Sequence, residues 1–98
     1  MTTIEQRDSM LEKLRFVPDL FCRAMMGEFL LYSAGQLFGG IYNNRLLLKR
    51  TAAGEKFGLP EEIPYQGAKP MYRIVELDDP VVVQTIIRET CALLPPKK

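Results

Sequence analysis

Two short turn sequences divide residues 27–50 into three apolar stretches, and this division constrains the fold more than any other feature of the chain. Asn43-Asn44 suits a two-residue hairpin turn of type I′, because asparagine tolerates the positive φ angles that this turn requires. Ser33-Ala34-Gly35-Gln36 is a second turn, in which Gly35 supplies the flexible position. The pattern predicts a three-stranded antiparallel meander with strands at 27–33, 36–42 and 45–50.

Pairing around the two turns sorts the strand side chains onto two faces. It places Tyr42 opposite Arg45 and, with a two-residue second turn, Leu31 opposite Phe38. The face expected to bury the core holds Leu30, Tyr32, Leu37, Ile41, Leu46 and Leu48. The other face is also largely apolar and holds Phe29, Leu31, Phe38, Tyr42 and Leu47, with Arg45 and Lys49 among them.

A helix is expected before the meander, over residues 2–17. Apolar residues recur there at helical spacing, while charged residues fill the other side. A capping box can begin this helix at Thr2 or at Thr3, and Pro18 ends it.

A final helix is expected to begin at Asp79 and Pro80, because aspartate caps a helix well and proline fits its first turn. The elements predicted after the meander are a short helix at 51–58, a loop at 59–70, a strand at 71–76 and a helix from 80 to 94, with a frayed tail at Lys97-Lys98. The order helix, three strands, short helix, strand, helix predicts a single α+β domain over residues 1–98. We expect two layers, an antiparallel sheet with the helices on one face.

Composition excludes several classes of protein. The 98 residues hold 13 basic and 12 acidic side chains, so the net charge of +1 gives no global attraction to nucleic acid or membrane. Histidine is absent, which removes the commonest general base and metal ligand, and Cys22 and Cys91 are expected to be unreactive core thiols. We therefore expect no enzymatic activity, no metal and no cofactor. Without a signal peptide or a long apolar run, a cytoplasmic protein is expected.

An ordered set of short motifs resembles the N-terminal domain of the TfoX/Sxy family. The motifs are Met25-Met26-Gly27-Glu28-Phe29-Leu30-Leu31-Tyr32, Gly35, Gly39-Gly40-Ile41-Tyr42, Arg45-x-x-x-Lys49, Pro64-Tyr65-x-Gly67-Ala68-Lys69-Pro70-Met71, Leu77-Asp78-Asp79 and Leu94-Pro95. The resemblance covers residues 20–96, and the ordered set is more specific than any one of its motifs.

This resemblance implies a bacterial domain associated with control of competence for DNA transformation, acting with a transcription regulator of the cyclic-AMP receptor protein type. It also implies a fold like that of the secretion chaperones, which agrees with the order of elements above. Longer members have a second, C-terminal domain, so we expect a stand-alone copy of the first. The resemblance transfers no catalytic residues, and the function expected is a non-enzymatic regulatory module that works through protein contacts.

The second face of the sheet is the first candidate site. Helices on one side leave Phe29, Leu31, Phe38, Tyr42 and Leu47 exposed on the other, and monomers rarely expose such an apolar area. We expect an interface there, with a homodimer as its first occupant. The alternative is that residues 20–26, or a different register, hide these side chains.

Arg45 and Lys49 lie among aromatic residues on the same predicted face. This arrangement is typical of sheets that bind single-stranded nucleic acid, where bases stack on rings and cations hold phosphates. Direct nucleic-acid binding is therefore the alternative function. The structural interpretation is that cross-strand pairs of aromatic and cationic residues stabilise the sheet.

The loop Pro64–Pro70 is the third candidate site. Gly67 leaves the backbone accessible, and Lys69 can hold an anion or a partner's carboxylate. The alternative is a rigid connection in which Tyr65 fills the edge of the core. Gly39-Gly40 indicates a bulge or the close approach of another element, and we favour close packing. A small-molecule sensor is a third functional interpretation, for which the sequence shows no dedicated pocket.

Overall fold

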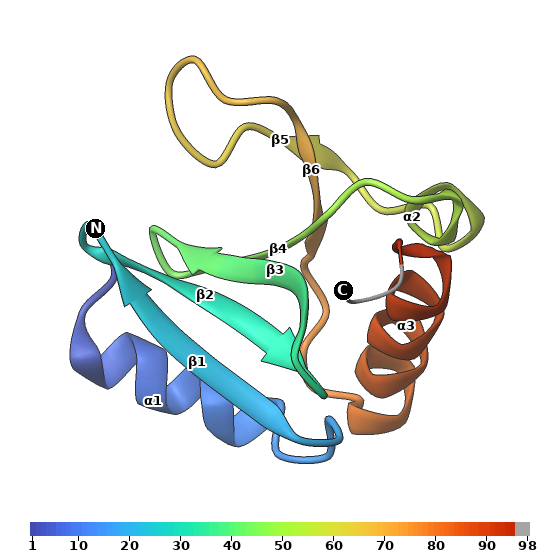
Figure 1. Cartoon of the computed structure of the whole chain (residues 1–98), viewed down its shortest axis with the longest axis horizontal. Helices are drawn as coiled ribbons and strands as arrows, with labels where there is room; N and C mark the ends of the chain where they lie inside the picture. Colours follow the sequence, from blue (N-terminus) through green and yellow to red (C-terminus); the bar gives the residue numbers. More distant parts are fainter. Residues whose placement is uncertain (96–98) are drawn as a thin grey trace.

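The computed structural model describes residues 1–95; the frayed tail expected at Lys97-Lys98 lies outside the described residues, as does Pro96. Figure 1 traces the elements along the chain. In order they are α1 (Ile4–Lys13), β1 (Leu20–Met25), β2 (Glu28–Ser33), β3 (Gln36–Tyr42), β4 (Arg45–Leu48), α2 (Ala52–Lys56), β5 (Glu61–Glu62), β6 (Met71–Ile74) and α3 (Pro80–Leu93).

The strands form one antiparallel sheet in the order β1-β2-β3-β4-β6-β5, which confirms the predicted α+β class. β1 and β5 were not predicted. The sequence of β1, Leu-Phe-Cys-Arg-Ala-Met, does not alternate between apolar and polar residues, and its side chains are exposed or half-buried. β5 has only two residues, too few to give a pattern of its own. Both missed strands lie at the edges of the sheet.

Each hairpin among the first four strands turns through two residues with positive φ. The φ angles are 48° and 86° at Met26-Gly27, 50° and 79° at Ala34-Gly35, and 51° and 59° at Asn43-Asn44. Both predicted turns are therefore confirmed. The third was missed because methionine rarely adopts positive φ, so Met26-Gly27 carries a weaker turn signal than Asn43-Asn44.

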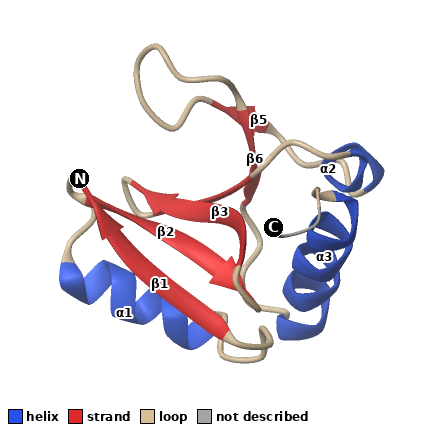
Figure 2. Cartoon of the chain, in the orientation of Figure 1, coloured by secondary structure: helices blue, strands red, loops and turns tan. Residues whose placement is uncertain are grey.

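Both long helices pack on the same face of the sheet (Figures 1 and 2). Thr3 caps α1 through a capping box with Gln6, which confirms one of the two predicted registers, and Asp79 caps α3 as expected. The core cluster joins residues of α1 and α3 to residues of the sheet: Met10, Leu14, Val17, Phe29, Leu31, Phe38, Ile41, Leu46, Leu48, Ile74, Val83, Ile86 and Ile87. Among residues 1–95, no helix is long and apolar enough to span a bilayer.

A bulge in β3 changes the predicted register between β2 and β3. Leu31 lies opposite Gly39 rather than Phe38, while Tyr32 lies opposite Leu37, so Phe38 is one extra residue on its strand. Gly39 accommodates the crowding there, since a Cβ on it would lie 2.1 Å from the Leu47 carbonyl oxygen. The Gly39-Gly40 pair thus marks both a bulge and a close approach of backbone.

The bulge places several side chains on the opposite face of the sheet from the one predicted. Phe29, Leu31 and Phe38 point into the core, with exposed fractions of 6%, 0% and 0%. Tyr42 and Leu47 lie outside the core cluster, yet they too are only 6% and 0% exposed. The prediction that these five residues form an exposed apolar patch is therefore wrong. The extra residue accounts for Phe29, Leu31 and Phe38, because it changes the side on which side chains next to the bulge lie. Tyr42 lies against Tyr65 of the loop Pro64–Pro70, with 6.3 Å between the ring centroids.

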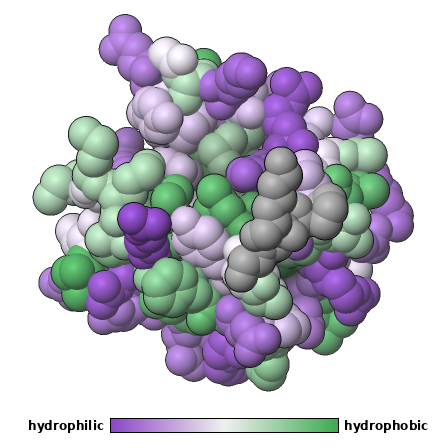
Figure 3. Space-filling model, in the orientation of Figure 1, coloured by the Kyte–Doolittle hydropathy of each residue, from purple (hydrophilic) through white to green (hydrophobic). Residues whose placement is uncertain are grey.

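The face opposite the helices is instead partly open along β1 and β2. Phe21 is 59% exposed and packs against Tyr32, with 5.8 Å between the ring centroids. Leu30 and Leu37 are half-buried on the same side, by the registers of β2 and β3. In the view of Figure 3, apolar side chains form small groups interspersed among hydrophilic ones.

Candidate functional site

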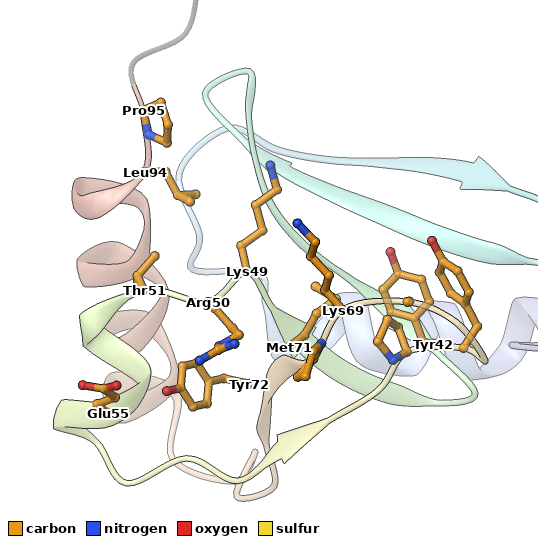
Figure 4. Close-up of a pocket in the computed structure, with 14 residues that line it drawn as sticks. Tyr42, Lys49, Arg50, Thr51, Glu55, Lys69, Met71, Tyr72, Leu94 and Pro95 are labelled. Atoms are coloured by element: carbon orange, nitrogen blue, oxygen red, sulfur yellow. The ribbon is translucent and has the colours of Figure 1, made fainter.

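A hollow of about 790 Å³ opens beside the end of β4 and beneath the loop Pro64–Pro70. We call it the basic pocket. Its main residues are Tyr42, Lys49, Arg50, Tyr65, Lys69 and Met71, and the N-terminal cap of α2 and the residues after α3 complete its wall. Figure 4 shows the ammonium groups of Lys49 and Lys69 pointing upward in the view, away from Arg50, Glu55 and Tyr72. Segments distant in the sequence thus meet at one site.

The pocket carries positive charge. Lys49 and Lys69 are exposed, and neither takes part in an ion pair with any residue from 1 to 95. Arg50 already forms an ion pair with Glu61, with 3.2 Å between Arg50 Nη2 and Glu61 Oε2. Among the carboxylates of residues 1–95, only that of Glu55 lines the pocket. The two lysines are therefore available to an anionic ligand.

The remaining wall is aromatic and apolar. Tyr42 and Tyr72 are nearly buried, whereas Tyr65 is 59% exposed and lies 6.3 Å from Tyr42 between ring centroids. Burial raises the pKa of Tyr42, and the nearby Tyr65 and Glu28 act in the same direction. The Tyr42 hydroxyl thus stays protonated at neutral pH and keeps its ability to donate a hydrogen bond.

Arg45 attaches the start of the pocket loop to the β3–β4 hairpin. Its Nη1 lies 2.8 Å from Glu62 Oε1 and donates to the Ile63 carbonyl oxygen at 3.3 Å. Its Nη2 donates to the Pro64 carbonyl oxygen at 3.2 Å, and its Nε to the Tyr42 carbonyl oxygen at 3.0 Å. Arg45 does not line the pocket, so its structural role is to position the loop that carries Tyr65 and Lys69.

Glu62 joins this attachment to the neighbouring strand. Its Oε2 accepts a hydrogen bond from Arg73 Nη1 at 3.0 Å, so two guanidinium groups share one carboxylate. The hydrogen bonds from Arg45 and then from Arg73 lower the pKa of Glu62 below its ordinary value. Arg73 Nε is buried and has no hydrogen-bond partner among the described residues. Within residues 1–95, Glu62 is the one carboxylate that two arginines of the sheet share.

The structure brings together only some of the predicted site residues. Lys49, Tyr65 and Lys69 meet in the pocket, while Gly67 lies at a positive φ of 87° where an added Cβ would touch nothing within 4 Å. Tyr65 does not fill the edge of the core, because it is more than half exposed. The predicted exposed platform of rings and cations is also wrong, since Phe38 is buried.

Several pocket residues were missed by reasoning from sequence. Arg50 directly follows Lys49, and Met71 directly follows the loop Pro64–Pro70. Their position next to predicted site residues is the signal that could have indicated them. Leu94 and Pro95 reach the pocket only through the packing of α3, and nothing local in the sequence indicates this.

The cysteines lie outside the pocket. Burial raises the pKa of both thiols, and for Cys22 it outweighs the opposite effect of Arg7. Both are free and both are packed beside the core cluster. Across residues 1–95, no group of three or more His, Cys, Asp or Glu side chains is placed to hold a metal ion.

The fold and the pocket together define a small α+β domain that presents a basic, tyrosine-lined site. The chain is 38% identical over 77 residues to a protein of Spirochaeta aurantia named "Uncharacterized 12.7 kDa protein in trpE 5'region", and the match covers 76% of this chain and 67% of that protein. The chain belongs to the same family as that protein. No protein-family model matches the chain.

Proposed function

We propose that the chain is a non-catalytic bacterial regulatory module that binds a protein partner at the basic pocket. The observation that carries this proposal is the pair of exposed lysines, Lys49 and Lys69, beside an aromatic wall and without carboxylate partners among the described residues. Two cations of this kind beside an apolar wall suit a ligand of opposite charge, because complementary charge speeds association and orients the partner.

The resemblance to the TfoX/Sxy N-terminal domain supports the regulatory part of the proposal. Most residues that line the basic pocket belong to the motifs that carry the resemblance, including Tyr42, Lys49 and the segment Pro64–Met71. The proposed partner is a transcription regulator of the cyclic-AMP receptor protein type, and the proposed process is control of competence genes.

A pull-down from the native host tests this function. The immobilised chain is compared with the double variant Lys49→Ala/Lys69→Ala and with a control of equal charge change, Lys13→Ala/Arg88→Ala. Captured proteins are identified by mass spectrometry, and the candidate regulator is then purified and titrated against each variant. We expect the wild type and the control to bind a transcription regulator and the pocket variant to lose it.

Two results would contradict the proposal. Equal retention of the regulator by the pocket variant would place the contact elsewhere. Recovery of nucleic acid alone, surviving washes at high salt, would favour a nucleic-acid-binding function instead.

We also propose a homodimer, with its interface at β1 rather than at the five residues expected from the sequence. The five residues first expected to form it are buried, whereas Phe21 on the edge strand β1 is exposed beside Tyr32. An exposed aromatic side chain on an edge strand, packed against a half-buried tyrosine of the neighbouring strand β2, supports association of two copies there.

A further inference from the structure

We propose that the basic pocket holds an acidic peptide segment, with carboxylates at Lys49 and Lys69 and an apolar side chain against the tyrosines. This inference rests on the proposed function and names the chemistry by which the partner is recognised.

The positive charge of the pocket favours a ligand that carries carboxylates. Lys49 directly follows β4 and Lys69 lies in the loop before β6, and both ammonium groups point the same way (Figure 4). Arg50 is held by Glu61, and Glu55 lies away from the two ammonium groups. The two lysines thus place unpaired positive charge on one side of the pocket, where a ligand with two nearby carboxylates gains charge-assisted hydrogen bonds.

The apolar wall of the pocket favours a ligand that also carries an apolar side chain. Tyr42, half-buried Met71 and Leu94 line the same hollow as the lysines. An apolar or aromatic side chain placed against them leaves water, which favours binding roughly in proportion to the area removed. A ligand that combines carboxylates with one apolar side chain therefore matches both parts of the pocket.

Size and rigidity favour a short peptide over a single residue. A volume of about 790 Å³ lies within the range of about 300–1,000 Å³ typical of sites for drug-sized ligands, which corresponds to a few residues. Arg45 fixes the start of the loop through the Glu62, Ile63 and Pro64 contacts. A loop that is already ordered before binding loses less conformational entropy when the ligand binds.

Nucleic acid fits this surface less well than an acidic peptide. Single-strand binding requires a basic groove that follows several phosphates and exposed rings on which bases stack. Here Arg45 and Arg73 share Glu62, Phe38 is buried, and the net charge of the chain is +1. Two free lysines and one exposed tyrosine serve a short anionic segment better than a strand of phosphates.

Selection from a random 12-residue peptide library displayed on phage tests the inference. The wild-type chain is expected to enrich peptides with two or more Asp or Glu within four residues of an apolar side chain. Three fluorescein-labelled probes then follow by anisotropy: the consensus peptide, its Gln/Asn counterpart and a 12-nucleotide oligo-dT. We expect Lys49→Ala/Lys69→Ala to weaken consensus binding by about 10- to 100-fold, since charge-assisted contacts of this kind are worth about tenfold each. Lys13→Ala/Arg88→Ala should bind as the wild type does, and thermal melts confirm that both variants are folded.

Each other outcome overturns the inference. No enrichment, or a consensus without acidic residues, rules out the acidic peptide; if the host regulator is still lost from the pocket variant, the proposed function stands and only its chemistry is wrong. Consensus binding unchanged by the lysine substitutions places the peptide elsewhere. Binding of oligo-dT, without binding of the peptide, assigns the pocket to nucleic acid.

Discussion

Arg45 and Glu62 form an ion pair of 2.8 Å that joins the β3–β4 hairpin to the segment entering the pocket loop. The two residues are 17 positions apart, and both side chains are less than one third exposed. Because the same guanidinium group also holds the Ile63 and Pro64 carbonyl oxygens, the pair determines where the loop leaves the sheet. Arg45 thus helps to set the shape of the basic pocket without lining it.

Replacing Arg45 should therefore release the loop while the core remains intact. In Arg45→Ala, we expect chymotrypsin to cut after Tyr65 several times faster than in the wild type, because local opening exposes the loop backbone to the protease. Mass spectrometry of timed digests measures the rate of this cut. Arg88→Ala on α3 is the matched control and should leave the rate unchanged. Equal cleavage rates in wild type and Arg45→Ala would show that the loop holds its position without the ion pair.

Stability should fall in acid partly through Glu62. The hydrogen bonds from Arg45 and Arg73 lower the pKa of this carboxyl in the folded state below its value in the unfolded chain. A lowered folded-state pKa contributes stability above the unfolded pKa, and this contribution is lost as pH falls through the folded pKa. Urea unfolding between pH 7 and pH 2.5 measures the effect. Glu62→Gln should be less stable at pH 7 and should show a shallower decline below pH 4.5, the ordinary pKa of glutamate. Parallel pH curves for the two proteins would contradict this assignment.

An introduced charge should destabilise the protein far more at Phe38 than at Phe21. Phe38 is fully buried in the core, so Phe38→Glu should lower the free energy of unfolding by about 3–5 kcal/mol or more. Phe21 is 59% exposed, and Phe21→Glu should change stability by about 1 kcal/mol or less. Urea titrations compare the stabilities, and light scattering compares the masses. If two copies associate through β1, only Phe21→Glu should give a smaller, folded species. A folded Phe38→Glu of wild-type stability would disprove the observed register.

An added methyl group should lower the free energy of unfolding much more at Gly39 than at Gly67. At Gly39 a Cβ would lie 2.1 Å from the Leu47 carbonyl oxygen, so Gly39→Ala should destabilise by more than about 3 kcal/mol or prevent folding. At Gly67 a Cβ would touch nothing within 4 Å, and only the positive φ of 87° opposes it. Gly67→Ala should therefore cost about 1–2 kcal/mol. Urea midpoints of the two variants test this order, and a Gly39→Ala protein more stable than Gly67→Ala would refute it.

The elements of the fold were largely predictable because their signals are local. The Asn43-Asn44 turn and the Asp79-Pro80 helix start each act within a few residues, and both are found where expected. The register between β2 and β3 was not predictable in this way. It depends on whether the backbone near Gly39 extends or bulges, and the approach of Leu47 from another strand decides this.

The candidate site was predictable as residues but not as an arrangement. Lys49, Tyr65 and Lys69 were singled out for their chemistry, and the packing of the loop against β3 brings them together. Arg45 was expected to face a ligand, and only the fold reveals that its donors are directed to Glu62 and to loop carbonyl groups.

The extra residue at Phe38 has a consequence for how this sequence can change its length. A deletion of one residue between Leu37 and Gly40 would remove the bulge while Phe29 stays opposite Ile41 and Tyr32 opposite Leu37, so the side chains of β2 would keep their faces. A codon lost from the middle of β2 would instead turn the side chains on one side of the loss to the opposite face, which would move Phe29 or Leu31 out of the core. Within β2 and β3, tolerance to single-residue deletions should therefore be highest at the bulge.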